Sequence, residues 1–146
     1  MNKSNCFSNV ILLVEDDPDD ILITKRAFKE SSTISTLYIV KNGVDAIKFV
    51  FKKDEYRDAP TPSIILLDIN MPKMDGFQVL KELKANKMTR KIPIIMLTTS
   101  SRDNDVEKAY KNGCNNYIQK PVSYEKFIKT LHELQDYWLN KSKIPI

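Results

Sequence analysis

The sequence has 146 residues, of which 42% are hydrophobic and 29% are charged, and its formal net charge is +4. This length is sufficient for one domain with its own hydrophobic core. No segment approaches the roughly 20 consecutive apolar residues of a transmembrane helix. The short apolar run at 10–14 is followed at once by Glu15, which is not the pattern of a signal peptide. The two cysteines, Cys6 and Cys114, are too few for a disulfide framework, so we expect a reduced, cytoplasmic protein that does not associate with membranes.

The basic residues are spread along the sequence, in small clusters such as Lys52–Lys53 and Arg90–Lys91. Scattered lysines are typical of a solvated surface, so the net charge alone does not predict nucleic-acid binding. The acidic residues are less evenly distributed, because five of them fall between positions 15 and 20. This acidic segment is therefore the first candidate for a functional site.

The chain begins with a pattern of strand, helix and strand. Apolar runs at 10–14 and 37–40 have the composition of short β-strands. Between them, Asp17 followed by Pro18 is typical of a helix cap with proline in the first helical position. The apolar residues that follow share one helical face, which predicts a helix to about Glu30.

The middle of the chain predicts a second helix and the most deeply buried strand. Asn42-Gly43 marks a turn, and helical spacing of apolar residues follows over 44–51. Residues 52–63 then form a long polar connection that contains two prolines. The continuous apolar run at 64–67 lies between prolines on both sides, which predicts a strand buried on both faces, as in a parallel sheet.

Another helix, strand and helix follow. Apolar spacing predicts a helix over 77–86, and the buried run at 92–98 predicts a strand that ends in a threonine. Ser100 or Ser101 can cap the next helix, which Gly113 ends. The inner face of this helix is predicted to consist of Val106, Ala109 and Tyr110.

The chain ends with a short strand at 117–118 and a helix that Ser123 caps. The apolar stripe of this last helix consists of Phe127, Leu131, Leu134 and Trp138. Such a stripe is more often core than interface. Trp138 lies near the end of the helix and is the member that we expect to depart from this rule.

Five strands that alternate with five helices predict an α/β fold in which helices cover both faces of a parallel sheet. Right-handed crossovers leave few topologies, of which the doubly wound sheet is the most common. We expect a single domain over 1–146, with a core at about 9–139 and a C-terminal tail at 140–146.

In a parallel sheet, the carboxyl ends of all strands lie at one edge, where open α/β sheets place their ligands. Glu15 and Asp16 follow the first predicted strand, and Asp68 follows the third. Thr98 ends the fourth strand and Lys120 follows the fifth. These residues are therefore expected to be neighbours in space.

Carboxylates gathered in this way need a cation. Two like charges about 4 Å apart repel by roughly 4 kcal/mol at an intermediate dielectric, and Lys120 alone cannot balance three or four carboxylates. Oxygen ligands without nearby Cys or His favour Mg²⁺ over softer metals. A cation, a lysine, a hydroxyl and a carboxylate together suit phosphoryl transfer, in which Asp68 can act as the nucleophile.

Four motifs carry a resemblance to a known family. They are Leu-Leu-Val-Glu-Asp-Asp at 12–17, Ile-Leu-Leu-Asp-Ile-Asn-Met-Pro-Lys-Met-Asp-Gly at 65–76, Met-Leu-Thr-Thr-Ser at 96–100 and Tyr-Ile-Gln-Lys-Pro at 117–121. With these motifs in this order, the chain resembles the receiver domain of two-component response regulators from about residue 9 to residue 139. The resemblance implies a flavodoxin-like sheet with strand order 2-1-3-4-5.

The resemblance also implies a role for each residue at the strand ends. Asp68 resembles the phosphoacceptor, and Mg²⁺ is expected to be held by Glu15, Asp16, Asp68 and the backbone carbonyl of Asn70. Lys120 resembles the lysine that pairs with the phosphoryl group. Thr98 resembles the hydroxyl that moves to bond it, and Tyr117 the switch aromatic that turns inward as a result. The family further implies a cis peptide bond between Lys120 and Pro121.

By the same resemblance, the partner that donates the phosphoryl group is a sensor histidine kinase. The only histidine, His132, has no expected role, so the phosphohistidine must come from that kinase. The output is expected to pass through an unidentified downstream protein or a homodimer, by repacking of the face from Arg102 to Ile118 and the last helix. The long connection at 52–63 and the chain beyond Trp138 are similar to small stand-alone regulators that pair with phytochromes.

Three other functions stay open at this point. A flavin-binding flavodoxin-like protein would share the sheet, but the acidic segment at 15–20 would repel the phosphate of the flavin. An aspartate phosphatase would share the Asp68-x-Asn70 spacing, although that class usually has its nucleophile after the first strand. DNA binding has only the net charge in its favour.

Thr99, beside Thr98, is predicted to border the path of the water that would hydrolyse an aspartyl phosphate. Its bulk, compared with Ala or Gly, predicts a phosphoryl half-life of minutes or longer.

Overall fold

The computed structural model describes residues 9–31, 34–100 and 102–141. Ser101, Cys6 and the predicted tail from 142 onward lie outside the described residues. Within the described part of the chain, no helix has the length and apolar character needed to cross a membrane.

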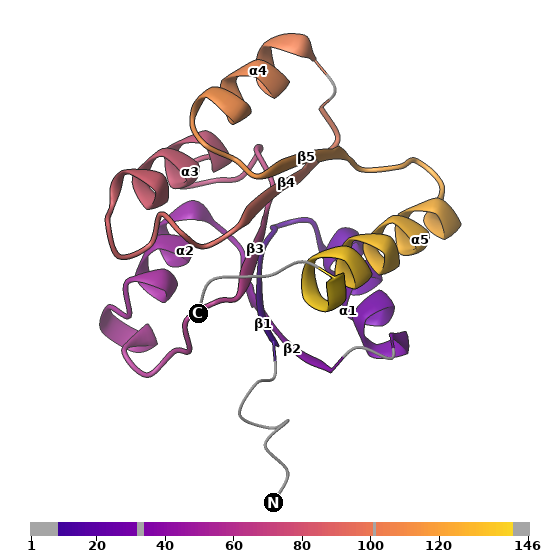
Figure 1. The fold of residues 1–146 in the computed structure, drawn as a ribbon, viewed down its shortest axis with the longest axis horizontal. Helices are drawn as coiled ribbons and strands as arrows, with labels where there is room; N and C mark the ends of the chain where they lie inside the picture. Colours follow the sequence, from indigo (N-terminus) through magenta and orange to yellow (C-terminus); the bar gives the residue numbers. More distant parts are fainter. Residues whose placement is uncertain (1–8, 32–33, 101, 142–146) are drawn as a thin grey trace, which may run out of the picture.

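Five parallel strands form one sheet in the order β2-β1-β3-β4-β5, which confirms the predicted fold and topology (Figure 1). The strands are β1 (Asn9–Val14), β2 (Ser35–Val40), β3 (Ile64–Leu67), β4 (Ile94–Thr98) and β5 (Asn116–Gln119). All side chains of β3 and β4 are buried, as expected for strands that helices cover on both faces.

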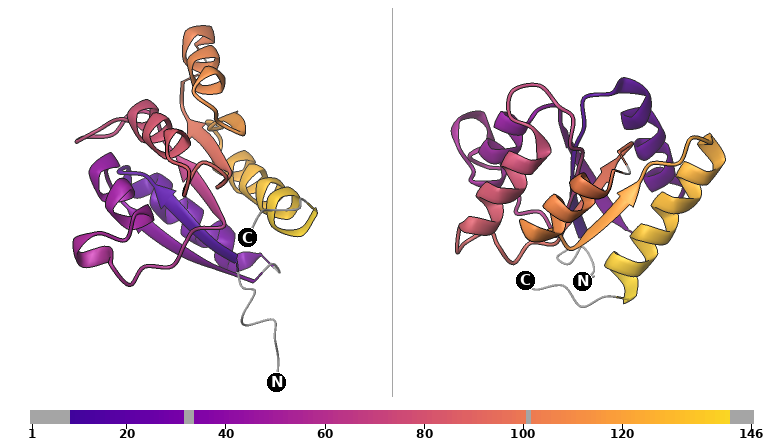
Figure 2. Two further views of the ribbon diagram at one scale, coloured as in Figure 1. Left: turned by 60° about the vertical axis from the view of Figure 1, so that its left-hand side comes forward. Right: turned by 90° about the horizontal axis from the view of Figure 1, so that it is seen from above.

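The five helices are α1 (Pro18–Glu30), α2 (Gly43–Val50), α3 (Gly76–Ala85), α4 (Asp103–Lys111) and α5 (Tyr124–Gln135). Figures 1 and 2 show α1 and α5 on one face of the sheet and α2 and α3 on the other. Two separate apolar clusters result. One contains Phe28 of α1 and Leu131 of α5, and the other contains Phe49 of α2, Leu80 of α3 and Ala109 of α4.

Side chains predicted from the sequence as caps or turn residues begin three of the helices. The Asp17 side chain caps α1 by accepting from the backbone N–H groups of Asp19 and Asp20, and Pro18 is the first helical residue. The Ser123 hydroxyl accepts from the backbone N–H of Lys126 at the start of α5. Asn42, predicted as part of a turn, caps α2.

The connection at 52–63 has more structure than its polar composition predicts. It contains a short 3₁₀-helix, η2 (Asp54–Tyr56), and the Tyr56 ring packs 5.5 Å from the ring of Phe49 in α2. Lys48 of α2 lies 3.5 Å from the Asp54 carboxylate. An aromatic contact and an ion pair therefore fasten this segment to α2.

The start and inner face of α4 differ from the prediction. The helix begins at Asp103 after Arg102 and has no side-chain cap, because the Ser100 hydroxyl donates to the Asp105 carboxylate at 2.6 Å. Ala109 is its only buried residue, and Tyr110 is 47% exposed. The predicted inner face is thus confirmed for Ala109 and wrong for Tyr110, while Val106 is half-buried.

The predicted stripe of α5 is buried at Phe127, Leu131 and Leu134. After Gln135 the chain continues into a π-helical segment, η3 (Asp136–Lys141). Trp138 lies in this segment, half-buried against the cluster beneath α1 and α5. It is more exposed than the rest of the stripe, in the direction that we predicted.

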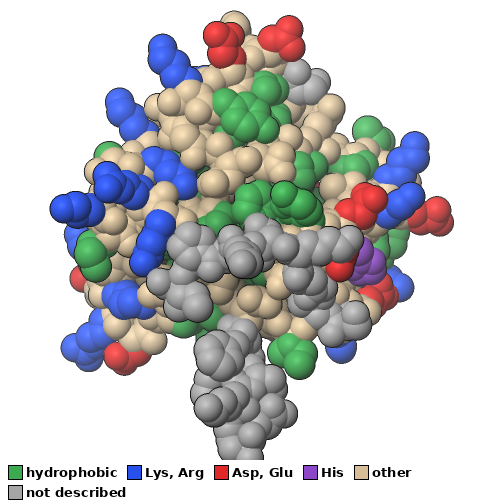
Figure 3. All heavy atoms as spheres, in the orientation of Figure 1, with side chains coloured by type: hydrophobic (Ala, Val, Ile, Leu, Met, Phe, Trp, Pro, Cys, Tyr) green, Lys and Arg blue, Asp and Glu red, His purple; other side chains and the backbone are tan. Residues whose placement is uncertain are grey.

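The basic residues are less dispersed in space than in sequence. Figure 3 shows Lys and Arg side chains gathered on the side of the molecule that carries α2 and α3. Lys84 of α3 is half-buried, and its ammonium donates to the carbonyls of Arg90 and Ile92 and to the Asn115 side chain, at 2.9 to 3.1 Å. Burial lowers the pKa of Lys84. Its charge fastens α3 to the amino-terminal edge of β4, away from the acidic residues.

Candidate functional site

The carboxyl ends of β1, β3, β4 and β5 bring the predicted site residues to one edge of the sheet. Backbone hydrogen bonds fix them there. The N–H of Asp68 donates to the carbonyl of Val14 at 3.2 Å, and the N–H of Lys120 donates to the carbonyl of Thr98 at 2.7 Å. Asp68 and Lys120 therefore owe their positions to the ends of the strands that precede them.

Lys120 pairs with more carboxylates than any other described basic residue at this edge. Its side chain is only 5% exposed, and its Nζ contacts three carboxylates. It donates to Glu15 Oε1, to Asp20 Oδ2 at 2.7 Å and to Asp68 Oδ2 at 3.4 Å. A buried ammonium is tolerable only when it is paired and hydrogen-bonded in this way.

Three carboxylates at this edge can hold a divalent cation. Oxygen atoms of Glu15, Asp16 and Asp68 all lie within 4.8 Å of one another. Glu15 and Asp68 are buried, whereas Asp16 is exposed. Hard oxygen ligands of this kind, with one side open to water, fit Mg²⁺ or Mn²⁺. The residues present therefore suit the predicted cation.

The electrostatics of the cluster depend on burial. Burial raises the pKa of Glu15 to about 7, although the hydrogen bond and charge of Lys120 oppose this rise. Burial also disfavours the charged form of Lys120, but its hydrogen bonds to Asp20 and Glu15 and the charge of Asp68 outweigh that effect and raise the pKa of Lys120. Lys120 is thus the charged member of the pair, and burial disfavours the carboxylate form of Glu15.

The loop after β3 holds the Asp68 side chain. Asp68 Oδ1 accepts from the N–H of Ile69 at 2.7 Å, while Oδ2 faces Lys120. The loop returns at Gly76, whose N–H donates to the Ile69 carbonyl at 2.9 Å. Asn70 is exposed within this loop, two residues beyond Asp68. The carboxylate is therefore oriented by its own backbone as well as by its charged neighbours.

Thr98 and Tyr117 lie on the neighbouring strands. Thr98 is fully buried at the end of β4. The Tyr117 hydroxyl of β5 donates to the carbonyl of Ser100 at 2.9 Å, and its ring packs against the cluster beneath α2 and α3. Burial raises the pKa of Tyr117. In this state the Tyr117 hydroxyl is tied to the loop after β4.

Sequence reasoning missed the role of one residue, Asp20. It lies in the first turn of α1, and its carboxylate oxygen Oδ2 lies 2.7 Å from the Lys120 ammonium. The available signal was the spacing from the cap residue Asp17, because a carboxylate three residues after the cap can lie over the same end of the helix. The sequence alone places Asp20 only in the acidic segment.

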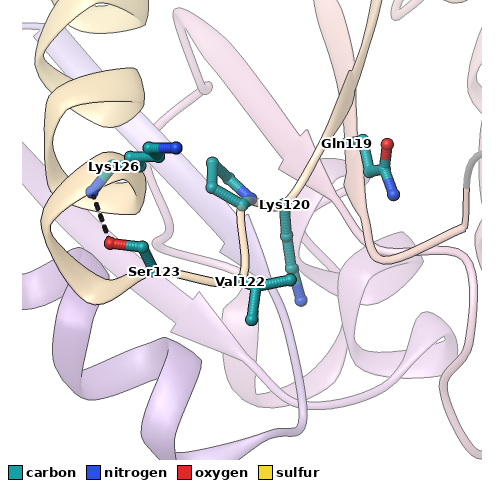
Figure 4. A pocket seen from close by; sticks show the side chains of 6 residues that line it. Gln119, Lys120, Val122, Ser123 and Lys126 are labelled. Atoms are coloured by element: carbon teal, nitrogen blue, oxygen red, sulfur yellow. Dashed lines mark hydrogen bonds between the residues drawn. The ribbon is translucent and has the colours of Figure 1, made fainter.

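Figure 4 shows the segment that follows Lys120. A cavity of about 460 Å³ is lined there by Gln119, Lys120, Pro121, Val122, Ser123 and Lys126.

The predicted cis bond between Lys120 and Pro121 is wrong, since no peptide bond of the described residues is cis. The trans form of an X-Pro bond is intrinsically favoured by about 0.5–1 kcal/mol, and Lys120 reaches its three partners with that isomer.

Comparison with known proteins identifies relatives with similar sequence and fold. The family model of the response regulator receiver domain matches residues 11–132. Response regulator Rcp1 of Synechocystis sp. is 36% identical over 136 residues, which cover 93% of this chain and 92% of Rcp1.

Two solved structures have nearly the same fold. The phosphorylated cyanobacterial phytochrome response regulator RcpA has a TM-score of 0.93 and 31% identity, with 95% of this chain and 99% of RcpA covered. The Mn²⁺-bound form of Rcp1 has a TM-score of 0.91 and 36% identity, with 94% of this chain and 99% of Rcp1 covered. The motifs, the sheet order and the acidic edge lead to one conclusion: the chain belongs to the receiver-domain family of response regulators.

Proposed function

We propose that this protein accepts a phosphoryl group on Asp68 from the phosphohistidine of a sensor histidine kinase, in a reaction that requires Mg²⁺. The observation that carries the proposal is the position of Asp68. Its carboxylate is nearly buried at the end of β3, 3.4 Å from the ammonium of Lys120 and within 4.8 Å of carboxylate oxygens of Glu15 and Asp16. The protein is then a single-domain cytoplasmic signalling protein, with its core at about 9–139.

The transfer exchanges one bond to phosphorus for another. An oxygen of Asp68 attacks the phosphorus atom, and an acyl phosphate P–O bond forms while the P–N bond of phosphohistidine breaks. The electron pair of the P–N bond stays on the ring nitrogen, and because the other ring nitrogen of the phosphohistidine carries a proton, the leaving group is neutral imidazole. The Asp68 carboxylate is well placed for this step because Ile69 orients one of its oxygens and Lys120 lies near the other.

Mg²⁺ would be held by Glu15, Asp16, Asp68 and the backbone carbonyl of Asn70, and when bound it neutralises charge on the transferring group. Lys120 is already charged and within 3.4 Å of Asp68, so it can pair with the new phosphoryl group with little movement.

The phosphoryl group then changes the neighbouring strands. The Thr98 hydroxyl moves to donate to it, and Tyr117 gives up its hydrogen bond to the Ser100 carbonyl to occupy the space that opens. The surface of α4, β5 and α5 changes as a result. The output passes to a downstream protein or through self-association of the phosphorylated chain.

The name of one relative guides the choice of kinase. RcpA is described as a cyanobacterial phytochrome response regulator, and its fold is nearly superimposable on this one. We therefore propose a phytochrome-type histidine kinase as the phosphoryl donor. Faster transfer from such a kinase than from an unrelated histidine kinase, at equal concentrations, is the expected result.

Intact mass after incubation with acetyl phosphate tests the chemistry without any kinase. We expect the protein to gain one phosphoryl group with Mg²⁺ and none with a chelator. Asp68→Asn should abolish the gain, whereas Asp58→Asn, an exposed carboxylate outside the site, should leave it intact. A parent protein that takes up no phosphoryl group, or an Asp68→Asn variant that takes up as much as the parent, would overturn the proposal.

A further inference from the structure

The ammonium of Lys120 lies closer to Asp20 than to the proposed phosphoacceptor. Its Nζ is 2.7 Å from Asp20 Oδ2 and 3.4 Å from Asp68 Oδ2. Asp20 is not part of the carboxylate group that could hold a cation, which among the described residues consists of Glu15, Asp16 and Asp68. Lys120 is therefore shared between the cation cluster and a carboxylate that stands outside it.

Asp20 is held firmly in its place by the first turn of α1. Its N–H donates to the cap residue, at Asp17 Oδ1, with a distance of 3.3 Å. Its carbonyl accepts from the hydroxyl of Thr24 at 2.8 Å, and Thr24 is 1% exposed. The carboxylate thus projects from a fixed point of the helix, and its side chain is only 21% exposed.

Removal of the Asp20 charge would take away one of the three carboxylates that pair with the Lys120 ammonium. Its side chain is 5% exposed, so the ammonium is costly to leave without a charged partner. The ammonium would turn fully to its remaining partners, Glu15 and Asp68. These are two of the three carboxylates that a divalent cation would use, so the ammonium and the cation would compete for the same oxygens.

We propose that Asp20 is a positioning residue that draws the Lys120 ammonium away from Asp68, so that the Asp68 oxygens stay available to a divalent cation. The inference rests on the proposed function of this edge as a cation and phosphoryl site. It assigns to α1 a direct influence on the affinity of that site.

Two variants with the same change of charge test this role. Asp20→Asn removes the charge beside Lys120, and Asp19→Asn removes one from the preceding, exposed residue, which makes no ion pair with the described residues. Mg²⁺ is titrated into each metal-free protein, and binding is followed by amide chemical shifts. We expect Asp20→Asn to weaken Mg²⁺ binding roughly fivefold or more, and Asp19→Asn to weaken it by less than about twofold. Asp20→Glu, which keeps the charge, should recover most of the loss.

A second readout separates positioning from general damage to the fold. Phosphorylation by acetyl phosphate is measured as a function of Mg²⁺ concentration. Asp20→Asn should raise the concentration that gives the half-maximal rate, while the rate at saturating Mg²⁺ stays within about twofold of the parent. In the metal-free proteins, the ¹⁵Nζ resonance of Lys120 should shift in Asp20→Asn and stay in place in Asp19→Asn.

The outcomes distinguish this inference from the proposed function. A parent protein that binds no Mg²⁺ and takes up no phosphoryl group overturns both. A parent that does both, with an Asp20→Asn variant that matches Asp19→Asn in Mg²⁺ affinity, Mg²⁺ dependence and Lys120 resonance, overturns only the role of Asp20.

Discussion

Gly76 lies directly against the backbone of Asp68: a Cβ atom at position 76 would be 2.2 Å from the Asp68 carbonyl oxygen. No real Cβ contact is that short, so any side chain here must displace the residue that we propose to be phosphorylated. The backbone at the first residue of α3 therefore packs directly against the backbone at the end of β3.

Gly76→Ala is therefore expected to destabilise the protein by roughly 1–3 kcal/mol, as overpacking does, even though Ala is the better helix former. It should also slow phosphorylation by acetyl phosphate, since Asp68 shifts with its backbone. Urea unfolding and intact mass measure the two effects. Lys81→Ala, an exposed substitution in the same helix, is the control and should change neither. An unaltered Gly76→Ala protein would mean that the loop moves freely.

Asp16 is the exposed member of the carboxylate cluster, and its removal should separate cation binding from stability. Asp16→Asn relieves repulsion with Glu15 and Asp68, so the metal-free variant should be as stable as the parent or more stable. The parent should gain stability as Mg²⁺ is added, in proportion to the logarithm of its concentration above the dissociation constant. The variant should gain little. Asp19→Asn should respond to Mg²⁺ as the parent does, and an equal response from Asp16→Asn would exclude Asp16 from the site.

The raised pKa of Glu15 gives a pH dependence whose sign can be worked out. The value is about 7 in the folded protein against an ordinary value of 4.5, so the folded state holds a proton that the unfolded state releases. The stabilisation from this group is complete below pH 4.5 and is lost as the pH rises through about 7.

Metal-free parent and Glu15→Gln should therefore differ in their pH profiles of unfolding free energy. Between these two pH values the parent should lose more stability than the variant, by an amount on the order of 1–3 kcal/mol. Glu125→Gln, on the exposed start of α5, controls for the change of charge. Parallel profiles for parent and Glu15→Gln would show that Glu15 keeps an ordinary pKa.

Thr99 remains a predicted determinant of phosphoryl lifetime. It is exposed beside the buried Thr98, and its carbonyl accepts from the Gln119 side chain at 3.4 Å. We expect a half-life of minutes or longer for the parent, and faster loss for Thr99→Ala and Thr99→Gly, because a smaller side chain gives water more access. The decay of the phosphorylated mass after removal of acetyl phosphate measures this. Equal decay in all three proteins would contradict the prediction.

Much of the fold and site could be predicted because strand ends are easy to find. The apolar run at 64–67 predicts a buried strand, and a parallel sheet then brings Asp68 to the same edge as Glu15, Thr98 and Lys120. Capping chemistry likewise gave the starts of α1 and α5.

The remaining features depend on contacts that sequence patterns do not encode. Ser100 was a plausible cap for α4, but its hydroxyl bonds to Asp105 instead. The structure at 54–56 depends on the ring of Tyr56 meeting that of Phe49. The choice between the cis and trans forms of the Lys120–Pro121 bond depends on a free-energy difference of only about 0.5–1 kcal/mol. The link from Asp20 to Lys120 joins residues 100 positions apart and appears only once α1 and β5 are placed.

The sparse packing of α4 has a consequence for how the molecule opens. A helix that buries only Ala109 has little apolar contact to lose when it detaches, whereas α3 buries five residues and is fastened by Lys84. Its amide protons should therefore exchange with solvent well before those of α3, by local opening that leaves the sheet intact. A partner that binds this helix can reshape it at small energetic cost, without drawing on the stability of the core.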